Sequence, residues 1–181
     1  MEGPTIPDDE AARLAAVKKL GILDTQPEER FDVITRSAAK EFNAPISTIS
    51  IVDAHREWFK SKVGPIASEG DRKTSFCGHT IVRGKLFVVE DTHQDPMFQN
   101  NPQVVDPPHI RFYAGVTLLD HKTHQPVGAF CIKDTKPRKL SLTEINSLLQ
   151  YADRAEQELN GGQPNTSTLS IEPGSGPTDT D

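Results

Sequence analysis

The chain has 181 residues, a formal net charge of −6 and two cysteines. This length suffices for one domain with its own core, whereas a secreted protein of this size would more often carry a set of disulfides. The start of the chain has no signal-peptide pattern, and no apolar run approaches the ~18 residues of a membrane span. A pI near 5.5 argues against a nucleic-acid-binding face. We therefore expect a cytoplasmic protein that binds neither nucleic acid nor membranes.

The composition changes at Asn160-Gly161-Gly162. Residues 161–181 contain no Lys or Arg and consist mostly of Gly, Pro, Ser, Thr and acidic residues. Such a segment cannot bury enough apolar surface to offset its chain entropy. We expect a disordered acidic tail over 161–181, a folded domain over 9–160 and a flexible N-terminus over 1–8.

Start and stop signals predict two helices in the first quarter of the chain. Asp8 can cap a first helix that ends at Gly21, and its apolar stripe consists of Leu14, Val17 and Leu20. Residues 25–28, Thr-Gln-Pro-Glu, are typical of a capping box for a second helix, which ends before Pro45. The apolar stripe of this second helix consists of Phe31, Ile34, Ala38 and Phe42.

Five strands and a last helix follow. Period-two patterns rich in β-branched residues predict strands over 46–52, 57–63, 87–90, 110–119 and 127–132. The basic stretch Lys133–Lys139, interrupted by Asp134 and Pro137, is expected to be a solvated loop, with a phosphate-contacting patch as the alternative. A second capping box, Ser141 to Glu144, opens a helix that ends at Asn160-Gly161. The apolar stripe of this helix consists of Leu142, Ile145, Leu149, Ala152 and Leu159.

Two of these strands separate polar from apolar side chains. In the strand over 110–119 the alternate residues are Arg111, Tyr113, Gly115 and Thr117, and in the strand over 46–52 they are Thr48 and Ser50. If the apolar faces pack on the helices, the polar faces point together into a space roofed by residues 64–108. The sequence therefore predicts a ligand-binding site formed by Thr48, Ser50, Trp58, Cys77, His79, Asp91, Arg111, Tyr113 and Thr117.

A series of short motifs runs along the chain in a characteristic order. The motifs are Leu20-Gly21-Ile22-Leu23-Asp24-Thr25, Pro27-Glu28-Glu29-Arg30-Phe31-Asp32, Ile51-Val52-Asp53, Trp58-Phe59-Lys60-Ser61, Ser75-Phe76-Cys77-Gly78-His79, Asp95-Pro96-Met97-Phe98, Arg111-Phe112-Tyr113-Ala114-Gly115 and Gly128-Ala129-Phe130-Cys131-Ile132-Lys133-Asp134. This series resembles a GAF domain, and more narrowly the GAF sensor modules that precede histidine-kinase, diguanylate-cyclase or PAS segments. The resemblance covers about residues 9–160, and it is the order of the motifs that makes it specific.

The resemblance implies an α+β fold with a central antiparallel sheet of five to six strands. It places the N- and C-terminal helices on one face and a small-molecule pocket on the other, roofed by short helices and loops. GAF domains bind cyclic nucleotides, tetrapyrroles, small metabolites or nothing, so it leaves the ligand and any cofactor open. Because no kinase, cyclase or phosphodiesterase motif follows residue 160, we expect any output to pass through a partner protein or through chemistry of the pocket itself.

Arg111 is the candidate site residue with the strongest physical requirement. A guanidinium in an apolar neighbourhood needs an anion. That anion is either an internal carboxylate, Asp91 or Glu90, or the carboxylate or phosphate of a ligand. Tyr113 and Trp58 are either packing residues or aromatic walls of the pocket. His79 is a pH-sensitive donor in the same site if the ligand interpretation holds.

The two cysteines have alternative interpretations. Cys77 follows Thr74-Ser75, which can cap a short helix, and a thiol in a first helical turn is a candidate for reactivity or simply a packed side chain. Cys131 is expected in the core. No metal site is predicted from Cys77, His79, Cys131 and His109, because their spacing is not one that zinc sites use.

Function is therefore predicted at the level of a regulatory module. We expect a small-molecule-sensing GAF module without catalytic residues, a homodimer through its terminal helices, and an anionic small molecule as the ligand. The alternatives are a thiol-dependent enzyme or redox sensor similar to free methionine-(R)-sulfoxide reductase, and a ligand-free protein-interaction domain. The cysteine cluster associated with that reductase is missing, and no Gly-x-Ser-x-Gly motif of a serine hydrolase occurs.

Overall fold

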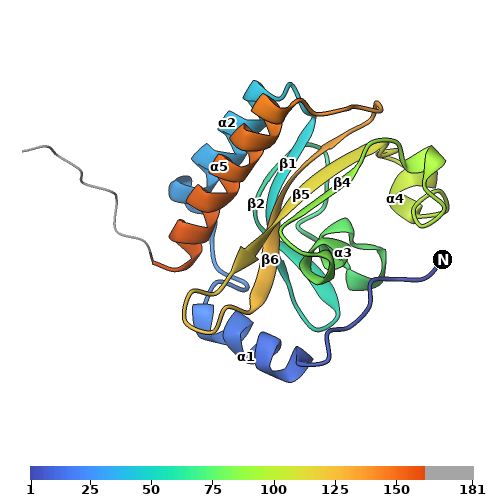
Figure 1. The fold of residues 1–181 in the computed structure, drawn as a ribbon. Coiled ribbons are helices and arrows are strands. Elements are labelled where there is room, and N and C mark those ends of the chain that lie inside the picture. The colour runs from blue at the N-terminus through green and yellow to red at the C-terminus, as the bar shows by residue number, and fades with distance from the viewer. Residues whose placement is uncertain (162–181) are drawn as a thin grey trace, which may run out of the picture.

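The computed structural model describes residues 1–161 and shows one antiparallel sheet of six strands with helices on both faces (Figure 1). The strand order is β3-β2-β1-β6-β5-β4. The strands are β1 (Ile46–Val52), β2 (Arg56–Val63), β3 (Glu69–Asp71), β4 (Leu86–Val89), β5 (Phe112–Leu119) and β6 (Pro126–Asp134). The helices are α1 (Glu10–Leu20), α2 (Glu29–Glu41), α3 (Phe76–Arg83), α4 (Pro102–Val105) and α5 (Leu142–Leu159), with two 3-10 turns, η1 (Arg72–Thr74) and η2 (Thr92–Gln94).

Helices α2 and α5 lie side by side on one face of the sheet (Figure 1). Their buried side chains, such as Phe31, Ile34 and Leu148, meet the strand residues Ile49 and Phe130 in the larger of two apolar cores. The apolar alternate residues of the predicted strands therefore lie on this face of the sheet, as the period-two pattern predicts. The predicted α+β class and helix-covered sheet are confirmed.

Helix α3 covers the other face, over β5 and β6, and the chain from β4 to β5 extends this layer through η2 and α4. A second and smaller core lies here, with Phe76, Phe98 and Tyr113 at its centre. Residues before α1 run across this layer, so that a Cβ atom on Gly78 would lie 2.8 Å from the Pro4 ring. Within residues 1–161 no helix is both long and apolar enough to cross a membrane. The predicted tail lies outside the described residues.

The capping signals in the sequence predict some helix ends correctly and others incorrectly. The capping box Ser141–Glu144 is present in full, with both reciprocal hydrogen bonds, and Gly21 ends α1 with a left-handed φ of 64°. The capping box predicted over 25–28 is wrong, because α2 has Glu28 as its N-cap residue without a side-chain cap. The Thr25 hydroxyl instead donates to the Ile22 carbonyl and accepts from the Lys60 ammonium.

The apolar stripes of the terminal helices differ from those predicted. In α1 the buried residues are Arg13, Ala16 and Val17, because this helix packs near the start of β6 rather than flat on the sheet. In α5 they are Leu148, Ala152, Ala155 and Leu159, and Leu142 is 81% exposed. Apolar spacing identified both helices, but the direction from which each approaches the sheet decides which side is covered.

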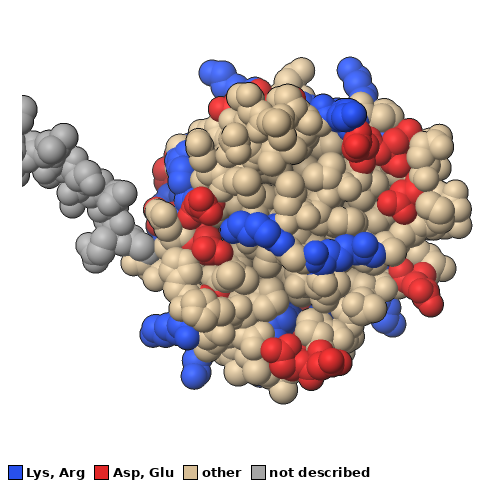
Figure 2. All heavy atoms as spheres, viewed as in Figure 1, with Lys and Arg blue, Asp and Glu red and all other residues tan. Residues whose placement is uncertain are grey.

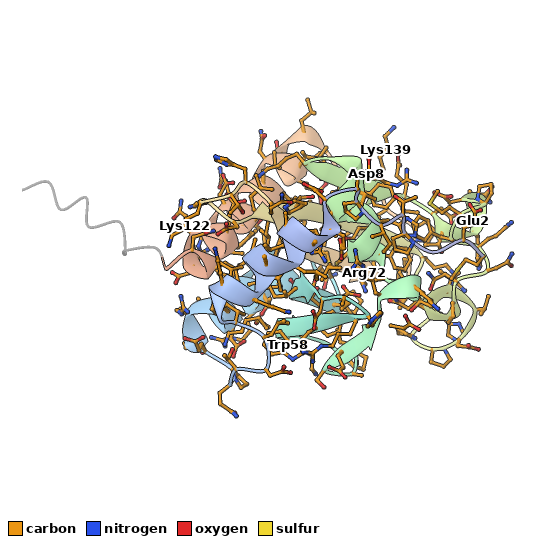
Figure 3. The ribbon with its side chains drawn as sticks, turned by 90° about the horizontal axis from the view of Figure 1, so that it is seen from below. Glu2, Asp8, Trp58, Arg72, Lys122 and Lys139 are labelled. Carbon is orange, nitrogen blue, oxygen red and sulfur yellow. The ribbon has the colours of Figure 1, made fainter. Side chains whose placement is uncertain are left out.

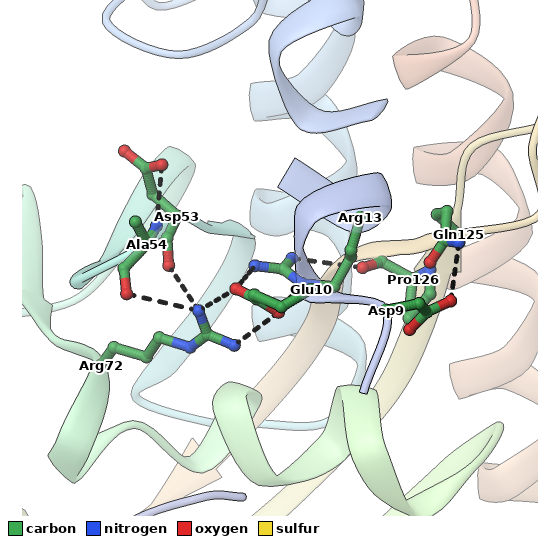
Figure 4. A network of polar contacts seen from close by, with 8 residues as sticks. All are labelled: Asp9, Glu10, Arg13, Asp53, Ala54, Arg72, Gln125 and Pro126. Carbon is green, nitrogen blue, oxygen red and sulfur yellow. Dashed lines mark hydrogen bonds and ion pairs between the residues drawn. The ribbon is translucent and has the colours of Figure 1, made fainter. Parts of the chain in front are cut away.

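A buried ion-pair network holds α1 to the rest of the domain (Figure 4). The fully buried Arg13 donates to both oxygens of Glu10 and to the Pro126 carbonyl at 3.3 Å. Arg72, which lies close to α1 in Figure 3, pairs with the same Glu10 and donates to the Asp53 carbonyl at 3.1 Å. Although burial raises the pKa of Glu10, hydrogen bonds and charge from Arg13 and Arg72 lower it to about 2. The network therefore joins α1, the β1–β2 turn and β6.

Gly115 has a steric role that its position in the middle of β5 makes testable. The Tyr113 side chain lies over Gly115, and a Cβ atom on Gly115 would lie 2.1 Å from the Tyr113 hydroxyl oxygen. Tyr113 is fully buried and cannot move aside freely. We expect Gly115→Ala to lower the free energy of unfolding by about 1–3 kcal/mol through overpacking. Urea denaturation measures this loss.

Gly70→Ala is the matched control for this prediction. Gly70 also lies in a strand, but nothing lies within 4 Å of the position that its Cβ would occupy. This variant should unfold at the same urea concentration as the wild type. Equal stability of all three proteins would show that Tyr113 has another place to go.

Candidate functional site

Polar side chains gather on the α3 face of the central strands. Sheet register places Thr48 of β1 opposite Cys131 of β6, and Tyr113 of β5 opposite Lys133 of β6. Ser50 and Thr117 both pair with Ala129, one from each side. All of these polar residues are buried. The prediction that the polar alternates of the two strands share one space is therefore supported for Thr48, Ser50, Tyr113 and Thr117.

Helix α3 closes this space from above. The Ser75 hydroxyl caps the helix by accepting from the Gly78 N–H at 2.9 Å, as predicted, and the first turn then points Cys77 inward. The Tyr113 hydroxyl lies 2.6 Å from the Thr80 hydroxyl and donates to the Cys77 sulfur at 3.3 Å. The Thr117 hydroxyl donates to the Gly84 carbonyl at 2.6 Å. These bonds tie α3 to β5.

Aromatic rings pack against one another between α3 and the sheet. Phe76 stacks on Phe98 with ring centroids 4.6 Å apart and on Tyr113 at 5.1 Å. Phe87 joins both Phe98 and Tyr113 at about 6 Å. The site is therefore closed by its own side chains, and a ligand would enter only if some of these rings moved.

Two buried charged residues, Lys133 and Glu57, belong to the same face but were not predicted. The Lys133 ammonium, on a residue 2% exposed, donates to the Gln103 side-chain oxygen at 3.0 Å and lies 5.5 Å from the Phe76 ring centre. Burial lowers the pKa of Lys133, but the charge of Glu57 and the neighbouring thiols outweigh this and raise it. The solvated loop predicted from Lys133 is wrong at its first residues, because β6 continues to Asp134 and the alternation points Lys133 inward.

Glu57 carries an acceptor that lacks a partner. The residue is 2% exposed, and within residues 1–161 no hydrogen bond reaches its Oε1 atom. Its pairing with Val52, a member of the α3-side core, puts it on the α3 face of β2. The alternation of side chains along the predicted strand 57–63 is the signal that could have found Glu57. It puts Glu57 on the same face as Phe59 and on the opposite face from Trp58.

The remaining predicted site residues lie elsewhere. Trp58 is on the opposite face of the sheet, in the core under α2 and α5, so it is not a wall of the same pocket as Tyr113. Asp91 caps η2 by accepting from the His93 N–H at 3.0 Å. His79 packs edge-on against Phe98 with ring centroids 4.9 Å apart. Near His79 a surface hollow of about 500 Å³ is lined by the N-terminal residues, Arg83 and Met97.

Arg111 has neither of the internal partners considered for it. Among residues 1–161 no carboxylate lies within ion-pair distance of its guanidinium. Its Nη1 atom donates instead to the carbonyls of Val104 at 2.9 Å and Ile110 at 3.2 Å. Strand β5 begins only at Phe112, so Arg111 precedes the regular strand and lies beside α4. Of the two alternatives for Arg111, the internal pair with Asp91 or Glu90 is therefore wrong, and the ligand anion stays a prediction.

Acidic and basic side chains are interspersed on the face drawn in Figure 2. No broad surface of one charge forms there, so the charged groups that distinguish the candidate site are the buried ones. These are Lys133 and Glu57, together with the partly buried Arg111 at the rim.

Substitution of Arg111 tests its lack of a carboxylate partner. Arg111→Ala removes hydrogen bonds to backbone carbonyls but leaves no buried charge alone, so we expect a loss of about 1 kcal/mol in the free energy of unfolding. Asp91→Asn keeps the η2 cap and should be nearly neutral. Urea denaturation of both variants decides the point, because a shared ion pair would cost about 3–5 kcal/mol in each.

The pH dependence of stability reports on His79. Burial, aided by the charge of Arg83, lowers the pKa of His79 to about 4, so the ring is neutral near pH 7 in the folded protein. The unfolded chain binds this proton at a pKa of about 6.5. The resulting stabilisation is present above pH ~6.5 and is lost as the pH falls toward 4.

We expect the melting temperature of the wild type to fall more steeply between pH 6.5 and 4 than that of His79→Gln, as measured by circular dichroism. His93→Gln changes an exposed histidine and should keep the wild-type slope. A wild-type slope in His79→Gln would mean that other groups dominate in this range.

The sequence of this chain is similar to those of known proteins. A model of the GAF domain family matches residues 26–159. A cyclic di-GMP phosphodiesterase of Pseudomonas aeruginosa is 38% identical over 138 residues. That match covers 76% of this chain and 23% of the relative, so the chain spans about a quarter of the relative's length.

Solved structures share the fold at low sequence identity. A type II free methionine-R-sulfoxide reductase from Thermoplasma acidophilum has a TM-score of 0.61 at 11% identity, covering 81% of this chain and 96% of that one. The blue-light absorbing form of the Thermosynechococcus elongatus PixJ GAF domain has a TM-score of 0.60 at 12% identity, covering 82% and 89%. Since the family model spans most of the chain and the sheet and helix layers agree with it, this protein belongs to the GAF domain family.

Proposed function

We propose that this protein is a sensory GAF module of a signalling system and binds a small polar molecule between α3 and the sheet. The family assignment and the relative that is a cyclic di-GMP phosphodiesterase support a role in signalling. The observation that carries the proposal is the concentration of buried polar groups on one face of the sheet, beneath a single short helix.

Burying these polar groups on the α3 face would lower the stability of the fold if the face served packing alone. A buried polar group without a partner destabilises the folded state by about 1–3 kcal/mol. The α3 face contains the unpartnered Glu57 Oε1 and the fully enclosed Lys133 ammonium, whose one hydrogen bond within residues 1–161 goes to Gln103. An unsatisfied group of this kind in a native fold commonly marks a functional site, a bound water or an ion. A ligand with a donor for Glu57 would remove the cost.

The charges define the class of molecule. Lys133 attracts a carboxylate or phosphate, and Arg111 at the rim, without a carboxylate partner in residues 1–161, adds to this. Glu57 accepts from an ammonium, amide or hydroxyl. We propose a small anionic or zwitterionic metabolite rather than a hydrocarbon or an extended polymer.

The shared strands give such a ligand a route to the outer helices. On β5, Tyr113 faces α3 and its neighbour Phe112 faces α5; on β6, Cys131 and Phe130 divide in the same way. Movement of Tyr113 to admit a ligand would therefore act on strands that α5 packs against. We propose that α5, paired with a second copy or with a signalling partner, passes this change on.

One observation favours a second function, a ligand-free protein-interaction domain. The rings of Phe76, Phe98 and Tyr113 already fill the space that a ligand would occupy. In that case the polar cluster would fix the position of α3 and the module would act only through its outer surfaces.

Native mass spectrometry of freshly purified protein separates these functions. We expect a second species whose added mass is non-covalent and is released by acid. Thr48→Val, which replaces the interior hydroxyl with a methyl group of similar size, should reduce the fraction of this species at least several-fold, because it changes the polarity of the site without changing its volume.

Ser47→Ala is the matched control for Thr48→Val. It lies on the same strand but faces α2, and its buried hydroxyl has no partner within residues 1–161. This variant should keep the bound mass and melt at or slightly above the wild-type temperature. Finding the bare chain mass in the wild type would contradict the sensory proposal and favour the interaction domain.

A further inference from the structure

The two cysteines of the chain meet in the interior although they are far apart in the sequence. Cys77 comes from the first turn of α3 and Cys131 from the middle of β6. Both are free and 0% exposed, both belong to the core beneath α3, and each shifts the pKa of the other. They are the only cysteines in the sequence, and the packing of α3 on β6 brings them into the same core.

The surroundings of the two sulfurs are unequal. The Thr48 hydroxyl lies 3.0 Å from the Cys131 sulfur, and the Lys133 ammonium is two residues along the same strand and on the same face. The Tyr113 hydroxyl donates to the Cys77 sulfur at 3.3 Å. The Cys77 thiol, the Lys133 charge and the Thr48 hydroxyl therefore favour a negative charge on Cys131, whereas the Glu57 carboxylate opposes it.

The titration of the pair follows the same asymmetry. Burial raises the pKa of Cys131, but the hydrogen bond from Cys77, the Lys133 charge and the Thr48 hydroxyl together bring it below its usual value. Burial and the neighbouring Cys131 raise the pKa of Cys77 well above its usual value. Cys131 is therefore the sulfur that ionises first, and Cys77 stays protonated beside it.

We propose that Cys77 and Cys131 form a peroxide-sensitive dithiol that closes into an intramolecular disulfide. In the first step the Cys131 thiolate attacks one oxygen of a hydroperoxide, the O–O bond breaks, and the products are a Cys131 sulfenic acid and the corresponding alkoxide or hydroxide. In the second step the Cys77 sulfur attacks the sulfenic sulfur, an S–S bond forms, the S–O bond breaks and water leaves with the Cys77 proton.

Burial selects the oxidant in this proposal. Neither sulfur is open to a protein disulfide or to a bulky substrate, whereas hydrogen peroxide is close to water in size. Helix α3 has eight residues and ends at Gly84, so local opening of this short element would admit a small molecule more readily than unfolding of the sheet. The disulfide would then tie α3 to β6. The inference is independent of the ligand proposed above, because no step of the oxidation uses that ligand.

The test exposes the full reduced chain to hydrogen peroxide at pH 7, removes the peroxide with catalase, and then alkylates the chain with iodoacetamide in denaturant. We expect a loss of about 2 Da, no alkylation, and one cross-linked peptide pair that contains Cys77 and Cys131. Dithiothreitol should restore two alkylatable thiols. Two free thiols after treatment, or separate sulfinic and sulfonic acids without a cross-link, would overturn the proposal.

Single-cysteine variants test the order of the two steps. In Cys77→Ser the reaction should stop at a Cys131 sulfenic acid that dimedone traps. In Cys131→Ser the remaining Cys77 should react at least tenfold more slowly. Fast dimedone labelling of Cys77 in Cys131→Ser would overturn the assignment of Cys131 as the first sulfur to react.

The hydroxyl of Thr48 acts through Cys131 and is a positioning residue. Thr48→Val should slow disulfide formation several-fold and move the pH profile of the rate to higher pH, because the thiolate loses a donor. Ser47→Ala, on the other face of the same strand, should leave both unchanged. An unchanged rate and pH profile in Thr48→Val would contradict this role, and circular dichroism of each variant verifies that it is folded.

Discussion

The central strands of the sheet are covered on both faces, and this constraint governs the rest of the molecule. Strands β1, β5 and β6 are buried almost throughout. Each polar residue on them must therefore find its partner inside the protein, since burial keeps bulk solvent away from both sides. The α2–α5 side meets this demand with an apolar core. The α3 side meets it with hydrogen bonds from Tyr113, Thr117 and Thr48 to α3 and β6.

The α3 side is held in place by directional hydrogen bonds as well as by burial. The Tyr113 hydroxyl contacts both Thr80 and Cys77, so a shift of α3 along the sheet would cost both contacts at once. Gly115 leaves the room in which the phenol ring lies. A polar network that is nearly satisfied specifies one arrangement more sharply than interchangeable apolar contacts do. On the α3 side of the sheet, within residues 1–161, the Glu57 Oε1 atom is the buried side-chain acceptor that remains unsatisfied.

The GAF family assignment and the geometry of this chain contribute different parts of the functional argument. The family explains why a sheet should carry a covering helix on one face and long helices on the other. It does not specify which groups lie in between. The buried ammonium of Lys133, the carboxylate of Glu57 and the two thiols are observed in this chain itself, and they direct attention to polar ligands and to sulfur chemistry rather than to stacking of a large planar cofactor.

The sequence alone determined the elements and most of the division between the faces. Period two placed Thr48, Ser50, Tyr113 and Thr117 on one side of the sheet, because alternation is a local property of an extended backbone. The cap at Ser75 and the box at Ser141 are equally local, since each is made within one helical turn. The strand over 46–52 was located correctly for the same reason.

Only the tertiary structure decided where those faces meet and which ends of the elements are regular. The predicted site groups Trp58 with Tyr113, yet the phase of Trp58 on β2 sends it to the other core, and a bulge between Ile49 and Ser50 shifts the pairing of β1 with β2. Lys133 is inside because β6 runs past the point where its apolar pattern ends. The partners of Arg13, Arg72 and Cys77 come from distant parts of the chain. Contacts of this kind depend on how elements approach one another in space, which no periodicity within a single element encodes.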